Sequence, residues 1–437
     1  MLMQAGFALV ATGLCRAKNA AQVISTNLFI FIFSVLAFWV CGFALLSGGW
    51  PAAPGGQWSV DILGRSFGLA GTRGFFLASQ GADPGRFALF FFQAMMLSLA
   101  AIIPAGIMAE RWRFTNLVLY ALWAAALPLA LFAHWVWGGG WLAQLGANLG
   151  LGHGFVDFSG SSVIHAGGAV IGLMGATALG PRLGKYSRDG RPRPIAGHNL
   201  VFVVSGTLLL AAGWLGFNVG PALFAAESRA PIIAVNSILA ATAGAAAACV
   251  LVKVKFRKPD PSMVCNGLLA GLAAISASGP FVSPSGAVLT GAVAGLLVVY
   301  AVVFFEATLK VDDPMGALAV HGVAGFWGIL SLGLVADGSF GANWNGVVRP
   351  AGVAGAFASL FGGQSNDWGQ LGAQVIGAST CLVFLGLAAW LWFKLSSLIA
   401  PLRTRREDEL AGLDLPELGA ECYPDFHLTD KSASHGD

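Results

Sequence analysis

The sequence is short of charged residues. Asp, Glu, Lys and Arg make up 10% of its 437 residues, whereas hydrophobic residues make up 56%. Soluble domains carry roughly 25% charged residues, because charge keeps their surface hydrated. A chain with so little charge cannot cover a water-exposed surface, so most of it must face lipid. The composition therefore excludes a soluble enzyme, a disordered protein and a nucleic-acid-binding protein.

Cysteine is scarce as well. The six cysteines form no C-x-x-C pair and no cluster, so we expect free thiols, and neither a disulfide framework nor a zinc site. No cleavable signal pattern precedes the first apolar segment. Glycine is abundant, with 60 residues, which suits a helical membrane bundle in which small residues let backbones approach closely.

Long apolar segments account for most of the chain. A hydrocarbon core of roughly 30 Å requires about 20 apolar residues of helix. Eleven segments meet or approach this length, at roughly 1–14, 21–46, 87–108, 114–136, 158–179, 199–225, 231–252, 263–280, 284–305, 315–336 and 370–393. The first is too short to span by itself. The sequence thus predicts an all-α membrane protein with eleven transmembrane helices in residues 1–400 and a tail in 401–437.

The basic residues are distributed unevenly between the loops. Of the 24 Lys and Arg residues, 19 fall in one set of alternating loops, and the other set holds Arg65, Arg73, Arg86, Arg229 and Arg349. Cytoplasmic loops are the basic ones. We therefore expect a multi-pass protein of the cell (inner or plasma) membrane, with the N-terminus outside and the C-terminus in the cytoplasm. From Glu407 onward the tail carries nine acidic residues and one basic residue.

Two stretches of the sequence share one pattern. Asp157 to Gly172 and Asp313 to Gly328 both read D-x2-G-x4-H-x6-G, and they open the fifth and tenth segments. Because five is odd, the second half enters the membrane from the opposite face. This arrangement predicts two inverted five-helix repeats plus a final helix, with the functional site near the midplane.

The spacing within the repeat places two histidines. His165 and His321 each lie eight residues beyond their aspartate, about 12 Å deeper in a helix. Entering from opposite faces, both rings would reach the middle, neutral and hydrogen-bonded to each other. A single buried histidine is more often a core residue, but two in matched positions favour a pore lining. No third ligand recurs at helical spacing to support a metal site.

Both aspartates of the repeat also have an ordinary structural interpretation. Asp and Asn-type side chains before a helix are good N-caps. We favour capping for Asp313, which precedes a proline. Asp157 fits equally well as a cap and as an electrostatic anchor for an incoming cation.

Eight motifs resemble those of the ammonium transporter (Amt/Mep/Rh) family, and of its Amt/Mep branch in particular. They are RAKN at 16–19, AERWRF at 109–114, HWVWGGG at 134–140, DFSGSSVIHAGGA at 157–169, GHNLVF at 197–202, GWLGFN at 213–218, DDPMGALAVHGV at 312–323 and GLDLPELGAECYPDF at 412–426. The resemblance implies the ammonium-transporter fold, a homotrimer in the lipid bilayer, and one narrow pore in each protomer. It implies no cofactor.

The resemblance also implies roles for particular residues. His165 and His321 match the twin pore histidines, which hydrogen-bond NH₃ or relay its proton. The residues that match substrate-binding and selectivity positions are Asp157, Trp137, Phe92, Met96, Phe217 and Trp214, of which Phe92 and Phe217 match phenylalanines near the pore entrance. Without the motifs, helix or lipid packing would be the simpler interpretation of Phe92, Met96, Phe217 and Trp214.

The sequence departs from the family pattern at several of these positions. Met96 stands at the second of two stacked gate phenylalanines, Pro221 stands where a serine hydroxyl is usual, and Ala11 stands where many members have Glu. We therefore expect a weaker outer ammonium site than a Phe pair and a serine would give. In the tail, Leu418 and Ala420 replace a His and an acidic residue, which weakens the expectation of standard tail-mediated regulation.

These features leave three function classes. The first is a transporter that recruits NH₄⁺ outside, deprotonates it and conducts NH₃, with methylammonium acceptance open. The second is an ammonium receptor of the same fold, which Met96 and Pro221 favour and the short tail disfavours. The third, a membrane enzyme with an Asp/His pair, lacks a nucleophile at helical spacing beside either histidine. For the tail, packing under neighbouring protomers and binding of a PII-type regulatory protein compete with a simple solvated end.

Overall fold

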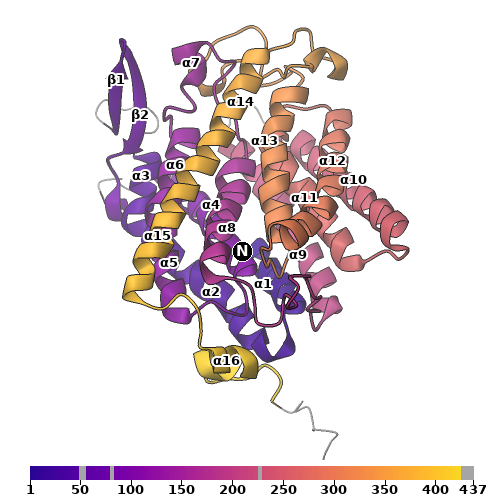
Figure 1. The fold of residues 1–437 in the computed structure, drawn as a ribbon. Helices are drawn as coiled ribbons and strands as arrows, with labels where there is room; N and C mark the ends of the chain where they lie inside the picture. Colours follow the sequence, from indigo (N-terminus) through magenta and orange to yellow (C-terminus); the bar gives the residue numbers. More distant parts are fainter. Residues whose placement is uncertain (49–55, 79–82, 225–228, 425–437) are drawn as a thin grey trace, which may run out of the picture.

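The fold is a helical bundle (Figure 1). The computed structural model describes residues 1–48, 56–78, 83–224 and 229–424. In these ranges ten helices are long and apolar enough to cross a membrane, and α1 (Leu2–Leu14) is a shorter apolar helix among them. The prediction of an all-α membrane protein with eleven apolar helices is confirmed in this form.

The elements follow the sequence segments closely. In the first half they are α2 (Ala20–Ala37), α3 (Phe43–Ser47), β1 (Gln57–Ile62), β2 (Arg65–Gly71), α4 (Pro84–Ile107), α5 (Phe114–Ala126), α6 (Pro128–Trp137), α7 (Leu145–Leu149) and α8 (Gly167–Leu179). In the second half they are α9 (Leu200–Val219), α10 (Ala230–Phe256), α11 (Pro261–Ser278), α12 (Pro284–Val303), α13 (Ala324–Val335), α14 (Trp368–Thr380), α15 (Gly386–Ile399) and α16 (Arg406–Ala411).

Two of the described spans each consist of two helices joined through a π-helical segment. The span Ala17–Ser47 contains α2 and α3, joined by Phe38–Gly42. The span Trp368–Ile399 contains α14 and α15, joined by Cys381–Leu385. The last span is thus longer at its end than the predicted 370–393.

Local sequence explains where helices begin. α4, α11 and α12 each start with proline at the first helical position, directly after Asp83, Asp260 and Ser283. The side chain of each preceding residue accepts a hydrogen bond from a backbone N–H of the first turn. Proline suits this position because its missing N–H would have had no helical partner.

The two halves are interleaved. α1 packs along α9, so the first helices of the two halves are neighbours. The π-helical segment Ser161–Ala166 contacts α13, and the corresponding segment Leu318–Val323 contacts α8. Such reciprocal contacts are expected where two inverted repeats meet.

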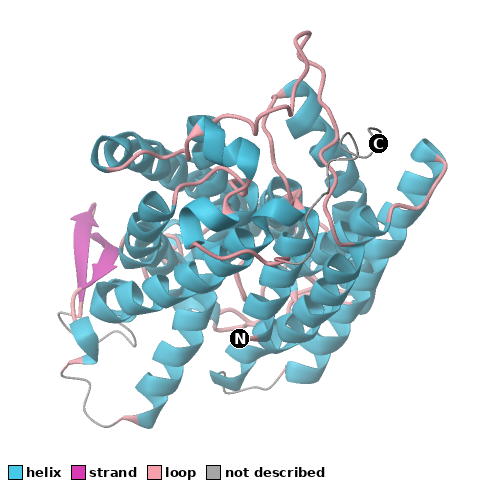
Figure 2. Cartoon of the chain, turned by 90° about the horizontal axis from the view of Figure 1, so that it is seen from below, coloured by secondary structure: helices cyan, strands magenta, loops and turns pink. Residues whose placement is uncertain are grey.

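A small β-hairpin, which the sequence analysis did not predict, stands at one edge of the bundle (Figure 2). β1 and β2 pair antiparallel, with Ile62 opposite Arg65, and Leu63 and Gly64 both have positive φ in the turn. Below we call the end of the bundle with this hairpin the hairpin face. The opposite end, where α16 lies, is the tail face (Figure 1).

Candidate functional site

Two histidines lie side by side in the middle of the bundle. The Nδ1 atoms of His165 and His321 are 3.2 Å apart, and their ring centroids are 5.2 Å apart. The two side chains belong to the π-helical segments Ser161–Ala166 and Leu318–Val323, which occupy matched positions in the repeats. Single π-helical turns occur often at functional sites, because the widened turn redirects a side chain.

Aromatic rings surround the histidine pair. The Trp214 ring lies 4.7 Å from the His165 ring and 6.2 Å from the His321 ring, measured between centroids. Phe217 lies 5.9 Å from His165, and Phe7 stacks on His321 at 5.3 Å. The Trp214 indole N–H donates to Ser276 Oγ over 3.1 Å, so the indole is fixed and its polar atom is used elsewhere.

The ring nitrogens of the pair are not all satisfied. In a neutral pair only one Nδ1 carries a hydrogen, so one ring exposes an acceptor Nε2 and the other a donor Nε2–H. Nε2 of His165 is buried and has no hydrogen-bond partner among the described residues. A small molecule that both donates and accepts hydrogen bonds would complete this arrangement.

Two cavities lie toward opposite faces. The large cavity, about 380 Å³, is lined from α4 by Leu89, Phe92, Gln93 and Met96, near the hairpin-face end of that helix. The small cavity, about 30 Å³, is lined by Gly106 at the other end of α4 and by His321. Water occupies a site of about 10–15 Å³ or more, so the small cavity has room for a molecule of that size.

Most of the residues predicted for substrate binding and selectivity line the large cavity. Phe92, Met96, Trp137 and Asp157 all line it, and so does Pro221.

Phe217 and Trp214 do not line the large cavity; they lie beside His165 instead. Phe217 is therefore deeper than the entrance position expected for it. Gly220 leaves space for the Phe92 ring, because a Cβ there would come within 2.4 Å of it. Ala11 lines the small cavity below His321.

Asp157 acts as a helix cap in this structure. Its carboxylate accepts hydrogen bonds from the backbone N–H groups of residues 160–163 and from the Ser162 hydroxyl. Burial raises the pKa of Asp157, and these hydrogen bonds oppose that shift. The carboxylate is turned toward the helix start that carries His165, so it fixes the position of that ring.

Asp313 plays the matching part in the second repeat. Its carboxylate accepts from the N–H of Leu318 over 2.7 Å and from that of Met315. Burial raises the pKa of Asp313 to about 6, against the opposing effect of these backbone hydrogen bonds. The capping interpretation that the sequence favoured for this residue agrees with the geometry.

Helix ends give the large cavity a bias toward cations. The span Ala17–Ser47 and helix α6 end at Ser47 and Trp137, two residues of the cavity wall. The carbonyl end of a helix carries a partial negative charge. The Trp137 indole N–H donates to the Asp157 carbonyl over 2.6 Å, which holds the ring in the wall.

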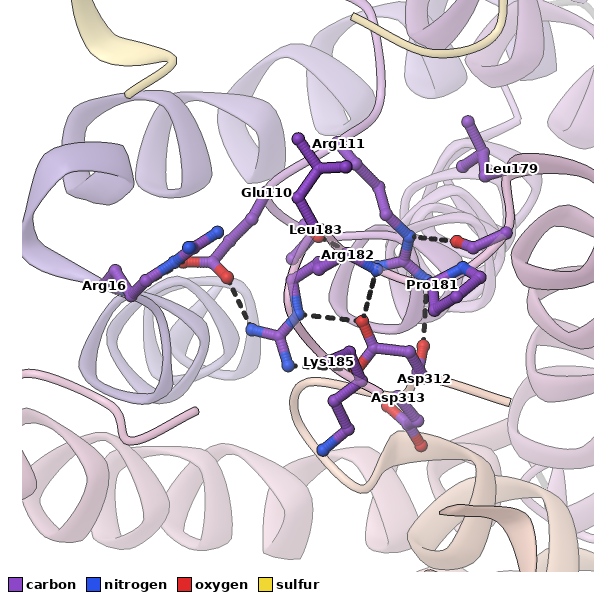
Figure 3. Close-up of polar contacts among 12 residues, drawn as sticks. Arg16, Glu110, Arg111, Leu179, Pro181, Arg182, Leu183, Lys185, Asp312 and Asp313 are labelled. Carbon is purple, nitrogen blue, oxygen red and sulfur yellow. Dashed lines mark hydrogen bonds and ion pairs between the residues drawn. The ribbon is translucent and has the colours of Figure 1, made fainter. Parts of the chain in front are cut away.

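Sequence reasoning missed a buried ionic cluster near the tail face (Figure 3). Arg182 bridges two carboxylates: it binds Glu110 and, through Nε at 2.9 Å, Asp312. Arg16 pairs with Glu110 over 3.1 Å, and Arg111 donates to the Asp312 carbonyl over 2.8 Å. These five charged positions were visible in the sequence only as loop charges, because the partners lie up to 201 residues apart.

Pairing controls the ionisation of these carboxyl groups. Burial opposes the ionisation of Asp312, but Arg182 and Arg111 outweigh it and lower its pKa to about 2. Burial also opposes the ionisation of Glu110, but Arg182 and Arg16 outweigh it and lower the pKa of Glu110. The cluster therefore stays charged at neutral pH and ties four loops together.

The described part of the tail also binds the tail face. The Asp414 carboxylate accepts from the N–H groups of Ala21 and Gln22, at the start of α2. Glu417 accepts from the N–H of Phe114, at the start of α5. Acidic groups are favourable at helix N-termini, so these tail residues cap the helices of their own chain rather than forming only a solvated end.

Paired buried histidines inside ten long apolar helices define a polytopic helical membrane protein with a candidate conduction site. The comparisons identify its family. The chain matches the model of the Ammonium Transporter Family over residues 1–423. It is 40% identical to Ammonium transporter Amt2 of Archaeoglobus fulgidus, over 98% of this chain and 87% of that protein. The chain belongs to the ammonium transporter family, as its motifs predicted, and the named relatives are transporters rather than enzymes.

Solved structures agree with this assignment. A structure titled Sensor Amt Protein has a TM-score of 0.80 and 30% identity, and the match covers 95% of both chains. Mep2 of Candida albicans has a TM-score of 0.77 at 24% identity, over 97% of this chain and 87% of that one, and shows the shared fold.

Proposed function

We propose that this protein conducts ammonium across a cell membrane, by recruiting NH₄⁺ in the large cavity and passing it as NH₃ along the histidine pair. One observation carries the proposal. The Nδ1 atoms of His165 and His321 lie 3.2 Å apart, and both side chains are buried between two cavities that approach from opposite faces. The family supplies the substrate, since the relative from Archaeoglobus fulgidus is named an ammonium transporter.

Recruitment depends on the wall of the large cavity. Trp137 offers a ring face to a cation, an interaction of roughly 0.5–2 kcal/mol. Asp157 and the carbonyl ends of two helices add a negative potential. Phe92 and Met96 then narrow the path and exclude hydrated ions.

Deprotonation explains how the pore distinguishes ammonium from K⁺. An apolar conduit imposes a barrier of several kcal/mol on any ion. K⁺ has no means of avoiding this barrier, whereas NH₄⁺ loses a proton and continues as neutral NH₃. The donor and acceptor Nε2 atoms of the pair hydrogen-bond NH₃ in turn, and the bridging Nδ1 atoms provide a route for the proton.

We infer the orientation of the protein in the membrane from its basic loops, and its assembly from the family resemblance. We assign the tail face to the cytoplasm, because the loops there hold most of the basic residues. Residues 1–400 then form the transmembrane domain, and 401–437 form a cytoplasmic tail. The resemblance supports a homotrimer and a PII-type regulatory protein as partner of the tail.

A receptor is the second candidate. The cavity holds Met96 in place of a second phenylalanine and Pro221 in place of a serine, and a structure titled Sensor Amt Protein is among the neighbours. A receptor would bind ammonium with little flux. Ammonium binding to the purified protein without ammonium-induced current in proteoliposomes would favour this candidate.

Ammonium-induced current on a solid-supported membrane, measured in excess K⁺, tests the transport proposal. We expect current in the wild type and its loss in His165→Ala and His321→Ala. The loss should be roughly a hundredfold, typical of removing a positioned proton-transfer group. His435→Ala, in the tail sequence, is the matched control. Unchanged current in both pore variants would refute the role of the pair.

A further inference from the structure

Two buried polar side chains in the wall of the large cavity have no role in the account above. Ser47 is 4% exposed and ends the span Ala17–Ser47, and Gln93 is 8% exposed and lies on α4. The Ser47 hydroxyl donates to Oε1 of Gln93 over 2.6 Å. Both residues line the cavity together with Phe92, Met96 and Trp137.

Several other polar groups of the cavity wall are engaged elsewhere. The Asp157 carboxylate accepts five hydrogen bonds from the helix start that it caps. The Trp137 N–H is a donor and is used by the Asp157 carbonyl. Asn345 donates to the carbonyls of His153 and Phe155. Pro221 has no hydroxyl, and Asn343 is exposed at the mouth.

The Ser47–Gln93 hydrogen bond leaves acceptor capacity on both of its oxygens. Because the hydroxyl hydrogen is given to Gln93, the lone pairs of Ser47 Oγ remain for another donor. Oε1 of Gln93 keeps a second lone pair as well. Two neutral oxygens 2.6 Å apart therefore form a compact acceptor pair for N–H donors.

The helix end that carries Ser47 is held rigidly. Nδ1 of His134 lies 2.9 Å from the carbonyl oxygen of Leu46, the preceding residue. Gly138 packs so closely on this turn that a Cβ would come within 2.2 Å of the same oxygen. Preorganised groups bind a ligand better, because less ordering is needed on binding.

We propose that Ser47 and Gln93 form the hydrogen-bond acceptor subsite for ammonium in the large cavity, in the role that a hydroxyl at position 221 would otherwise fill. NH₄⁺ donates to Ser47 Oγ and Gln93 Oε1 while its opposite side meets the Trp137 ring. K⁺ has no hydrogens to direct at these oxygens. This inference rests on the proposed recruitment of ammonium in the large cavity.

Binding of ammonium to the purified protein, followed by isothermal titration, tests the subsite. Hydrogen bonds to charged groups contribute more than neutral ones, so we expect Ser47→Ala and Gln93→Leu to bind ammonium about tenfold more weakly. Ser98→Ala is the matched control. Its hydroxyl is buried on the same helix but bonds to Met95 and Gln4, outside the cavity wall.

A rescue variant separates a binding role from a structural one. Pro221→Ser in the Ser47→Ala background should restore most of the affinity, because it returns a hydroxyl to the cavity. Thermal unfolding without ammonium shows whether each variant is folded. Wild-type affinity in both Ser47→Ala and Gln93→Leu, or a lower maximal current with an unchanged half-saturating concentration, would overturn the subsite.

The two proposals fail in different ways. If the wild type binds ammonium but gives no current, transport is wrong, and the subsite is still tested by binding. If the wild type gives current that saturates identically in the variants, transport stands and the subsite is wrong.

Discussion

The buried charged residues of the ionic cluster near the tail face have partners of opposite charge. Glu110 and Arg111 are fully buried, and Asp312 is 2% exposed. Burying an ion costs several kcal/mol unless its partners and hydrogen bonds compensate. Arg182 supplies that compensation for two carboxylates at once (Figure 3).

The lowered pKa of Asp312 predicts how stability depends on pH. Its pKa is about 2 in the folded protein, against an ordinary value of 3.8. A lowered carboxyl pKa stabilises the fold above the unfolded pKa, by about 2 kcal/mol here, and this contribution is lost as pH falls from about 4 toward 2. Asp312→Asn should therefore unfold at lower temperature than the wild type at pH 6, and the gap should narrow at pH 3.

The neighbouring Asp313 affects the pH dependence of stability in the opposite direction. Its pKa of about 6 lies above the unfolded value, so its ionisation costs stability as pH rises from about 4 to 6. Thermal unfolding of the detergent-solubilised protein from pH 3 to pH 7 measures both effects. Parallel curves for wild type, Asp312→Asn and Asp313→Asn would contradict them.

At the scale of elements, small residues set the distance between helices α10 and α12. A Cβ on Gly291 would come within 2.1 Å of the Ala240 carbonyl oxygen, and one on Gly295 within 2.1 Å of that of Gly244. Such contacts leave no room for a methyl group. The pattern is the small-xxx-small interface of membrane helices, in which close backbones replace a hydrophobic driving force.

Gly295→Ala should consequently destabilise the protein, although alanine favours a helix by about 1 kcal/mol over glycine. The overpacking cost of about 1–3 kcal/mol exceeds that gain. Gly216→Ala on α9 is the control, since nothing lies within 4 Å of its Cβ position, and it should be neutral or stabilising. Thermal unfolding in detergent compares the two, and equal midpoints would count against this interpretation.

At the scale of the whole molecule, the tail joins the ends of several spans. Asp414 and Glu417 cap α2 and α5, and Glu409 binds Arg403 over 2.8 Å and accepts from the N–H of Leu183. The acidic tail and the basic loops thus form one layer across the tail face. A partner that binds this face would meet an ordered surface.

Removal of residues 407–437 should have two effects. It leaves the N–H groups of Gln22, Phe114 and Leu183 without their acceptors, so the midpoint of thermal unfolding should fall, at about 1 kcal/mol for each lost cap. It should also abolish, in a pull-down, the capture of the PII protein that we propose as a partner of the tail. A shorter truncation, from residue 425, is the control for stability. Capture that persists without 407–437 would place the PII contact elsewhere.

The sequence alone determined the spans, the inverted repeat and the twin histidines, because these depend on hydropathy and on spacing along one helix. The separation along the chain between Asp157 and His165, and between Asp313 and His321, is the same wherever the helix lies. Phe217, in contrast, was expected near the pore entrance but lies beside His165. The depth of this residue depends on how α9 packs against the other helices.

Only the tertiary structure decided the contacts between distant segments. The Ser47–Gln93 pair joins residues 46 apart, and Arg182 reaches Asp312 across 130. Sequence periodicity reports which face of a helix is apolar, but not which residue of another helix lies opposite. That choice depends on how closely two backbones approach, and glycines such as Gly138 and Gly295 set the distance. The acceptor pair in the large cavity and the charged layer at the tail face therefore emerge only when the helices are packed.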